Sequence, residues 1–533
     1  SIYFNEFPLP DPKDWLEKIK QDLKGKEVAS LAWQISPGIK VPAVLQAGQV
    51  DENGPGTGTL PGVYPYRRGT AGQAENPKWQ VVGNGNKGKF DWEDVHAYRM
   101  DSRLLERLAS RLQPHQQAYH LYGPTPPQEV STQFLLTLAE KGLSPKLLTG
   151  TLTYDPISRA AARGEEVTSL EILQAGSGIP AFGGSPYFRP LGLDLRYLAD
   201  LGGNIVDQLS FGLATVVEYI LRIEALLPEL NRTTILNNMA LTVPVGTSFF
   251  PEMAKFRAFR ILIALVADAM GIRDQEAQGP FVLGCTNGYT HTQYDVHTNL
   301  LRQTTSAMSA ILGGVDALHI EAYDTTKGQE DASAHRLALN IQHLLRHEAH
   351  LAWVQDPGGG AYYVEHLTDA LGAAAWKRFQ EVEAYGGFSA ALRMGFIHEC
   401  LDHSAAHRAW KLSTGREALV GVNTSPHPDE VLDLNWPRFG TDERLAVPFE
   451  LLRQRADLQA SSQKRLQAAL WLFGDARMRN ARAQFARNLL GSAGFGILEN
   501  ADPADEAASL AELATAQPDV LVLCSSDDAY TAD

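Results

Sequence analysis

Residues 474 to 480, GDARMRN, follow an apolar run, AALWLF, and lead into a helical pattern. A loop that leaves a buried parallel strand and opens a helix is where doubly wound domains bind ligands. Arg477 and Arg479 cannot coordinate a metal, because a guanidinium group has no lone pair to give. They also place positive charge in the first helical turn, where the helix dipole disfavours it. The loop that contains Asp475 is therefore a weak candidate for binding phosphate and a poor candidate for binding a metal cofactor.

A glycine-rich string, GNGNKG at residues 83 to 88, matches the G-x-G-x-x-G pattern of dinucleotide sites. No strand–helix–strand unit is evident around it, and that context is what gives the pattern its meaning. We therefore expect a turn-rich loop in which glycine permits positive φ. Neither the G-x-S-x-G nucleophile motif nor the Walker P-loop motif occurs in the chain.

Three histidines, His343, His347 and His350, lie on one side of a predicted helix. Two histidines four residues apart can bind zinc, but HEAH is not the H-E-x-x-H signature, and Glu348 is misplaced to act as its base. We expect a polar helix face rather than a metal site.

The composition restricts the class of protein. The 533 residues predict two or more domains, and the net charge of −15 argues against a nucleic-acid partner. Cys285, Cys400 and Cys524 form neither a disulfide framework nor a zinc spacing, which fits a reducing cytoplasm. The charged N-terminus is unlike a signal peptide. No apolar run approaches the roughly 20 residues that cross a bilayer, so no membrane association is expected.

Strand-like and helical patterns alternate from about residue 116 to 386. Any functional site in the middle of the chain would be held by these elements. Helices are expected at 250–270, 294–312 and 331–349, the second ending at Gly313. The expected strands are AYHLYG, LLTGTLTYD, YFRPLGLD, ILNNMALTV, FVLGCTNG, ALHIEAYD and LAWVQDP. Repeated units of this kind predict an α/β fold with a parallel sheet. Seven or eight units fit a closed (β/α)8 barrel, with sites on the loops at the carboxyl ends of the strands.

The remaining segments suggest four regions. They are an N-terminal helix and extended arm (1–60), the barrel (61–390), a linker region (391–464) and a doubly wound domain (465–533). In the first region Trp15, Ile19 and Leu23 share one helix face, and we expect the arm to contact a partner.

The last region reads as strand, helix, strand, helix, strand, which is the first half of a doubly wound domain. Met478, Ala481, Phe485 and Leu489 form one face of its first helix. Three strands leave sheet edges open, so we expect the sequence to end inside this domain.

Several stretches together resemble the methylmalonyl-CoA mutase family, and the resemblance covers most of the chain from residue 62 onward. They are PGVYPYRRGT (61–70), LTYDPISRAAARG (152–164), YDVHTNLLRQTTSAMSAILGGVDALHIEAYD (294–324), LALNIQHLLRHEAHLAWVQDPGGGAYYVEHLTDALGAAAWKRFQEVEAYGGF (337–388) and LVGVN (419–423). The resemblance implies a (β/α)8 barrel that binds a CoA ester and a C-terminal flavodoxin-like domain that binds cobalamin.

The family's catalytic chains mark the cobalamin loop by Asp-x-His-x-x-Gly with a lysine four residues earlier. Here Asp475 remains, whereas Trp471, Arg477 and Asn480 replace the lysine, the cobalt-ligating histidine and the glycine. The resemblance therefore implies that this chain binds no cobalamin. Bulky Trp471 and Arg477 suggest that the former pocket is filled by side chains.

The barrel positions show the same losses. The family's Tyr-His pair, whose histidine contacts the thioester carbonyl, aligns with Val206 and Asp207. The CoA-contacting Arg-Leu-Ser strand aligns with a run that contains Asn238 and Ala240, while Tyr64 matches a tyrosine that sits over the substrate. The resemblance implies that Tyr64, Asp207, Asn238 and Ala240 are vestigial and that no catalytic residue is expected.

Some family members are heterodimers of a catalytic large chain and a non-catalytic small chain, and this sequence resembles the small chain. The resemblance implies a cytoplasmic isomerase subunit, inactive alone, whose large partner holds adenosylcobalamin and interconverts methylmalonyl-CoA and succinyl-CoA. Two alternatives stay open. One is an active acyl-CoA mutase of a related type with a displaced ligand set, and the other is an accessory protein that binds a CoA ester.

Overall fold

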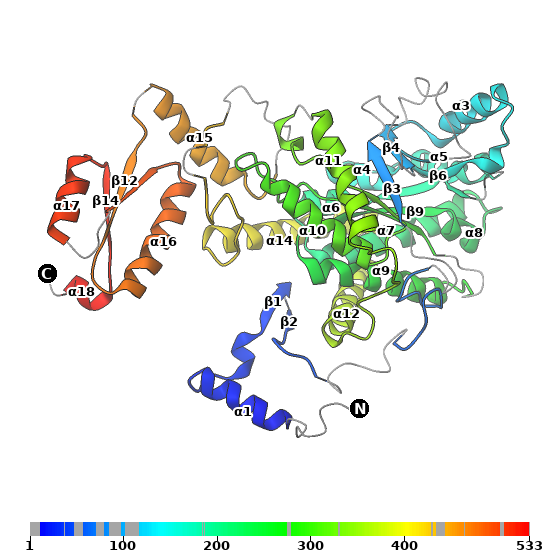
Figure 1. Ribbon diagram of the computed structural model, residues 1–533. Helices are drawn as coiled ribbons and strands as arrows, with labels where there is room; N and C mark the ends of the chain where they lie inside the picture. The colour runs from blue at the N-terminus through cyan, green and yellow to red at the C-terminus, as the bar shows by residue number, and fades with distance from the viewer. Residues whose placement is uncertain are drawn as a thin grey trace.

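The computed structural model describes residues 11–36, 38–46, 57–70, 79–84, 97–101, 117–183, 185, 187–273, 279–328, 331–427, 430–432, 443–462, 464–500 and 506–531. Helices surround a large parallel sheet, and a smaller parallel sheet lies toward the C-terminus (Figure 1). The predicted α/β class is confirmed.

The large sheet contains nine strands in the order β7-β6-β5-β4-β3-β11-β10-β9-β8, and every neighbouring pair is parallel. The strands are β3 (Gln80–Asn84), β4 (Ala97–Asp101), β5 (Ala118–Tyr122), β6 (Thr149–Thr153), β7 (Tyr187–Arg189), β8 (Leu191–Asp194), β9 (Met239–Val245), β10 (Phe281–Thr286) and β11 (Ala317–His319). The two strands at the ends of this order, β7 and β8, are separated in the chain only by Pro190. A Cβ on Gly192 of β8 would lie 2.6 Å from the backbone oxygen of Leu152 in β6. The two ends of the sheet therefore lie together at Pro190.

Helices pack on the outer face of this sheet. They are α3 (Pro127–Glu140), α4 (Pro156–Arg163), α5 (Ser169–Ala181), α6 (Arg196–Asp200), α7 (Ile205–Leu226), α8 (Arg232–Asn237), α9 (Phe249–Ala269), α10 (Thr298–Leu312), α11 (Ala332–His343) and α12 (Tyr362–Ala384). Leu152, Leu193 and Leu241 join the main core with these helices, and each is followed in its strand by a polar residue, Thr153, Asp194 and Thr242 respectively. Alternate strand residues point to opposite faces, so the polar neighbours lie on the inner face of the sheet.

The segment LAWVQDP was predicted as a strand, and that prediction is wrong. Residues 351–357 form turns after a π-helical stretch, Leu344–Glu348. Trp353 and Val354 are 70% and 58% exposed. An apolar run marks a strand only when the chain buries it, and these side chains lie on the surface.

Two strands of the large sheet that precede residue 116, β3 and β4, were not expected. Gly83 lies in β3, so the string at residues 83–88 starts inside a strand, contrary to the turn-rich loop predicted there. Residues 85–88 lie outside the described part of the chain. β4 escaped notice because its sequence, AYRMD, includes two charged side chains.

The region named as a linker, 391–464, begins within α13 (Phe388–Arg393), and its described part also contains α14 (Phe396–Ser413) and α15 (Val447–Ser462). The small sheet that follows has the parallel order β13-β12-β14. Its elements are β12 (Gln467–Leu472), α16 (Ala476–Ser492), β13 (Gly496–Glu499), α17 (Glu506–Thr515), β14 (Val520–Cys524) and α18 (Asp527–Thr531). Ala483 and Ala486 form the buried side of α16, whereas Phe485 and Leu489, on the face singled out from the sequence, are largely exposed.

At the N-terminus, α1 (Pro12–Asp22) precedes an antiparallel hairpin of β1 (Trp33–Ser36) and β2 (Ile39–Val41). Ile39 and Val41 are buried in the main core. Trp15 and Leu16 of α1 remain exposed, and this helix stands apart from the large sheet (Figure 1).

Candidate functional site

The crevice at the carboxyl ends of β12 and β14 is where a doubly wound sheet binds ligands, because the strand order reverses there. Asp475 caps α16, and its Oδ1 accepts a hydrogen bond from the Met478 N–H at 2.9 Å. Gly474 has a φ of +69°, and a Cβ there would lie 2.6 Å from Ser525 Oγ. Ser525 in turn donates to the Phe473 carbonyl at 2.9 Å. The loop of residues 474–480 therefore packs directly on the segment after β14.

Aromatic side chains cover the same edge of the sheet. The Trp471 ring stacks on Phe473 with centroids 4.5 Å apart, and Phe473 meets Tyr530 edge to face at 6.3 Å. The Tyr530 hydroxyl donates to the Leu523 carbonyl and accepts from the Ser525 N–H, both at 2.8 Å. These contacts pack Phe473 and Tyr530 against each other beside the loop of residues 474–480.

Arg477 and Asn480 are exposed on the first turns of α16. The suggestion that Arg477 fills a buried pocket is therefore wrong. Trp471 is half-buried and stacks on Phe473. Neither residue could replace a histidine toward cobalt, because a guanidinium group donates no lone pair and an amide is a poor ligand. The residues present do not fit a cobalamin bound through its metal.

The inner face of the large sheet carries polar side chains beside a small apolar cluster, and His120 of β5 is one of these polar residues. Its Nε2 lies 2.9 Å from Gln80 Oε1 of β3, and its Nδ1 lies 3.0 Å from Thr151 Oγ1 of β6. The ring stacks on Phe281 of β10 at 5.5 Å. Burial lowers the pKa of His120 to about 3, so the imidazole is neutral at pH 7. These contacts join four strands through one ring.

Charged residues follow the inner-face strands at their carboxyl ends. Arg196 forms a two-point contact with Asp194, at 2.6 and 2.9 Å, and its other nitrogen lies 3.7 Å from Glu321. Burial alone would raise the pKa of Asp194, but Arg196 outweighs it and holds that pKa below its usual value. His319 lies 3.9 Å from Glu321. The charged side chains at the carboxyl ends of these strands are therefore largely paired with one another.

The pair aligned with the family's Tyr-His positions contacts other parts of this chain. Val206 is buried. Asp207, 1% exposed, accepts from the Asn204 N–H in a capping box at the start of α7. Ser404 of α14 donates to its Oδ2 at 2.5 Å, and Arg378 of α12 lies 3.1 Å from its Oδ1. Asp207 thus joins three helices.

The structure does not bring the remaining vestigial positions together. The Asn238 amide donates to the Thr234 carbonyl at 2.8 Å, at the amino end of β9. Ala240 lies two residues further on, in β9, and is buried. The Tyr64 hydroxyl donates to the Ala264 carbonyl on helix α9 at 2.9 Å, so its phenol contacts an outer helix.

A buried lysine that sequence reasoning missed lies at the carboxyl end of β9. Lys255 of α9 donates to the Pro244 carbonyl at 2.5 Å and to Gln208 Oε1 at 3.0 Å, and it pairs with Glu252 at 2.5 Å. Burial lowers its pKa, which the Glu252 carboxylate opposes. The available signal was a group of charged residues, Glu252, Lys255, Arg257 and Arg260, in a helix that is otherwise mostly apolar. These bonds fix α9 to β9 and α7.

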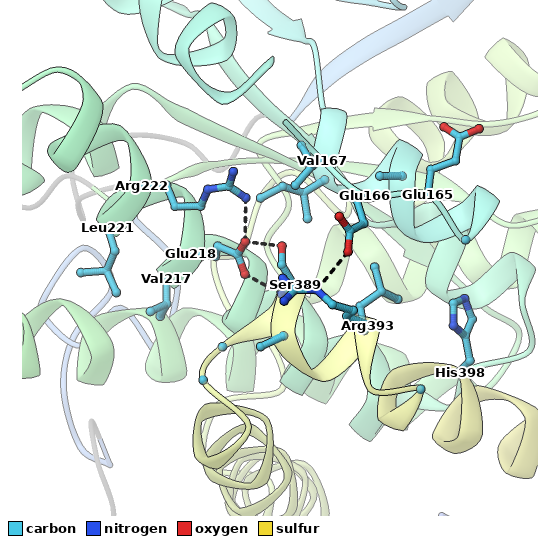
Figure 2. A pocket seen from close by; sticks show the side chains of 18 of the residues that line it. Glu165, Glu166, Val167, Val217, Glu218, Leu221, Arg222, Ser389, Arg393 and His398 are labelled. Atoms are coloured by element: carbon cyan, nitrogen blue, oxygen red, sulfur yellow. Dashed lines mark hydrogen bonds and ion pairs between the residues drawn. The ribbon is translucent and has the colours of Figure 1, made fainter. Parts of the chain in front are cut away.

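A cavity of about 780 Å³ opens on the outer side of the helices, between α7 and the start of α13 (Figure 2). Glu218 points to Ser389, whose N–H donates to it at 2.7 Å, and also pairs with Arg222 at 3.1 Å. Burial, together with Glu218, raises the pKa of Glu383 on the same wall. The cavity is acidic, and Glu218 anchors the first turn of α13.

The three histidines singled out from the sequence do not converge. The His343 and His347 rings stack 6.1 Å apart, while His350 stacks on Trp353 at 4.0 Å. Within the residues that the structure describes, no group of three or more potential ligands could hold a metal ion. No helix in those same ranges is long and apolar enough to span a membrane.

Comparisons with known proteins agree with one another. A sequence profile of the methylmalonyl-CoA mutase family matches residues 106–470. The chain is 30% identical over 569 residues to the methylmalonyl-CoA mutase small subunit of Porphyromonas gingivalis, covering 99% of this chain and 89% of that protein. It is 33% identical to the small subunit of Streptomyces virginiae, covering 74% of this chain but 65% of that protein. It is also 25% identical to the methylmalonyl-CoA mutase of Escherichia coli, over 79% and 65% of the two chains.

Proposed function

The chain belongs to the methylmalonyl-CoA mutase family, and from this premise we propose that it is a non-catalytic small subunit. Its partner would be a large catalytic subunit in a heterodimer. The holoenzyme would interconvert methylmalonyl-CoA and succinyl-CoA by a radical rearrangement that adenosylcobalamin initiates in the large subunit. Two of the similar proteins carry the name small subunit.

The observation that carries this proposal is the crevice of the small sheet. Its loop has Arg477 in place of a metal ligand, and Phe473, Ser525 and Tyr530 contact one another beside that loop. The inner face of the large sheet supports the same proposal. His120 and Arg196 are engaged with other side chains, so they are not free to bind a thioester carbonyl or a phosphate.

The experiment is a cobalamin titration of the purified chain, followed by absorbance. We expect no shifted spectrum with this chain alone and a shifted one with the large subunit. Mutase activity should appear only when both chains are combined. A bound corrinoid, or turnover by this chain alone, would favour the related active mutase. Binding of a CoA ester without cobalamin, measured by calorimetry, would favour the accessory protein.

Partner contact is proposed for α1. Trp15 and Leu16 are both 38% exposed, while hairpin residues Ile39 and Val41 already belong to this chain's own core. An exposed tryptophan is a typical anchor at an interface, and Leu16 adds apolar surface beside it. Pull-down with the large subunit, comparing wild type with a variant in which both residues are serine, tests this contact. A cytoplasmic location is part of the same proposal and is supported by the three free cysteines.

We propose further that the nine strands form a closed (β/α)8 barrel in which residues 187–194 act as one strand broken at Pro190. Proline has no N–H to donate, so it interrupts the ladder where β7 leaves β6 and β8 joins β9. Counting that pair once gives eight parallel strands, as the fold requires. The small sheet, with its order β13-β12-β14, is proposed as flavodoxin-like.

Substituting Gly192→Ala tests the closure. The added methyl group would lie 2.5 Å from Thr153 Oγ1 and 2.6 Å from the Leu152 oxygen, so β8 and β6 would have to separate. We expect the free energy of unfolding to fall by about 1–3 kcal/mol or more, as for other overpacked sites. Gly372→Ala is the matched control, because its Cβ would meet nothing closer than 4.0 Å. Equal urea midpoints for the two variants would contradict the closure.

A further inference from the structure

A second cavity, of about 360 Å³, lies at the carboxyl ends of β8, β9 and β10. Its lining includes residues 202–204 between α6 and α7, residues 246–248 after β9, and Asn287, Tyr289 and Thr290 after β10. Trp33 and the rest of β1 form one wall, and α14 with the turn after it forms the opposite wall. This volume suits a small ligand. The cavity is separate from the crevice of the small sheet and from the acidic cavity of Figure 2.

Positive charge is concentrated on the α14 side of this cavity, in a chain whose net charge is −15. Arg408, Lys411 and Arg416 line it, together with two acids. Arg408 is neutralised by Glu417 at 2.8 Å. The other acid, Glu252, is neutralised by Lys255.

Two cations therefore remain for a ligand. Lys411 is half-buried, and the described part of the chain provides its ammonium group with no carboxylate. Arg416 stacks on the Trp410 ring at 4.5 Å and likewise has no acidic partner among the described residues. Nearby, His407 Nε2 is buried and makes no hydrogen bond within those residues. A half-buried cation beside an unpartnered ring nitrogen favours an oxyanion.

Backbone groups add to this preference. Two helices begin at the cavity, and Asn204 caps α7 by accepting from the N–H groups of Val206 and Asp207. The N-cap of the 21-residue helix α9, Ser248, makes no such side-chain bond. The first N–H groups of a helix have no intrahelical acceptor and carry partial positive charge. The loop before α9, residues 246–248, lines the same cavity as the unpaired cations, so the N–H groups of Phe249 and Phe250 lie next to it, whereas Pro251 has no N–H to offer.

From these contacts we propose that the cavity binds a small dianion, either an organic phosphate or a dicarboxylate. Lys411 and Arg416 supply the two compensating charges, and His407 and the first turn of α9 supply hydrogen-bond donors. The apolar part of the ligand rests against Trp33 and Tyr289. Because β1 forms a wall, a bound dianion should also slow amide exchange in residues 33–36.

The test is calorimetric titration of the full chain with inorganic phosphate and, separately, with succinate at constant ionic strength. We expect saturable binding of at least one, and the tighter of the two identifies the class of ligand. Lys411→Gln and Arg416→Gln should each weaken it about tenfold or more, the loss typical of a charge-assisted hydrogen bond. Lys377→Gln, which makes the same charge change on the exposed side of α12, should leave binding unchanged.

Either of two results would overturn this assignment. One is the lack of saturable binding to both probes in the wild-type chain. The other is equal weakening by Lys377→Gln and Lys411→Gln, which would show only a long-range charge effect. Arg416 is exposed, so its variant keeps the fold intact and leaves the test decisive even if Lys411→Gln unfolds.

Discussion

Glu365→Gln will lower the free energy of unfolding by about 3–5 kcal/mol, the cost of breaking a buried ion pair. Glu365 of α12 accepts from Arg67 at 2.6 and 2.8 Å and from Arg257 of α9 at 2.7 Å. Both guanidinium groups are fully buried. Glutamine keeps the volume but removes the charge, so it leaves two buried cations with one fewer anion. Urea unfolding at pH 7 measures the loss.

The control is Glu140→Gln at the exposed end of α3, which should shift stability by no more than about 0.5 kcal/mol. The pH dependence of stability shows whether the effect of Glu365→Gln comes from the lost charge or from a change in side-chain shape. Burial raises the pKa of Glu365, but Arg257 and Arg67 outweigh it, so the folded-state pKa lies below the usual value. Its contribution is present above about pH 4.3 and is lost as the pH falls through the folded-state pKa. A gap between wild type and variant that does not narrow below pH 4 would contradict this explanation.

Much of the fold was predictable because most strands of the large sheet are buried on both sides. β9 and β10 are therefore nearly continuous apolar runs that the pattern reveals directly. β3 and β4 were missed because their inner-face residues, Gln80, Arg99 and Asp101, interrupt that pattern with polar side chains. The polar side chains on the inner face are therefore the reason that β3 and β4 were not predicted from the sequence.

The candidate sites were predictable only in part, for a related reason. Asp475 was placed correctly at the start of a helix, since a strand, a glycine and an N-cap residue follow one another in sequence. Lys255 and Lys411 were not identified, because their surroundings come from segments far apart in the chain. Lys255 is surrounded by Gln208 and Pro244, which lie in other elements. Lys411 lies in a cavity that forms only because the fold brings α14 beside β1. Local spacing carries no information about such assemblies.

Asp457→Ala will loosen the small sheet from the large one. Asp457 of α15 has a fully buried side chain that accepts from Tyr294 Oη at 2.7 Å and pairs with Arg465 at 2.5 Å. Tyr294 follows β10 of the large sheet, and Arg465 precedes β12 of the small one. Removing the shared carboxylate takes an acceptor from the buried Tyr294 hydroxyl and an anion from the Arg465 guanidinium group. We expect this to lower the free energy of unfolding by about 3–5 kcal/mol. Hydrogen exchange should accelerate in residues 467–472 and stay unchanged in β9.

Two further variants give this prediction its controls. Tyr294→Phe removes only the hydroxyl and keeps the ring against Arg453, whose guanidinium carbon lies 4.2 Å from the ring centroid. Its effect should be smaller, about 1–3 kcal/mol, because one buried acceptor loses a donor. Asp402→Ala removes an exposed carboxylate from α14 and should leave exchange in β12 as in the wild type. Identical exchange in the Asp457 and Asp402 variants would mean that other contacts hold the two sheets together. The order Asp457, then Tyr294, then Asp402 is what a single buried carboxylate joining them requires.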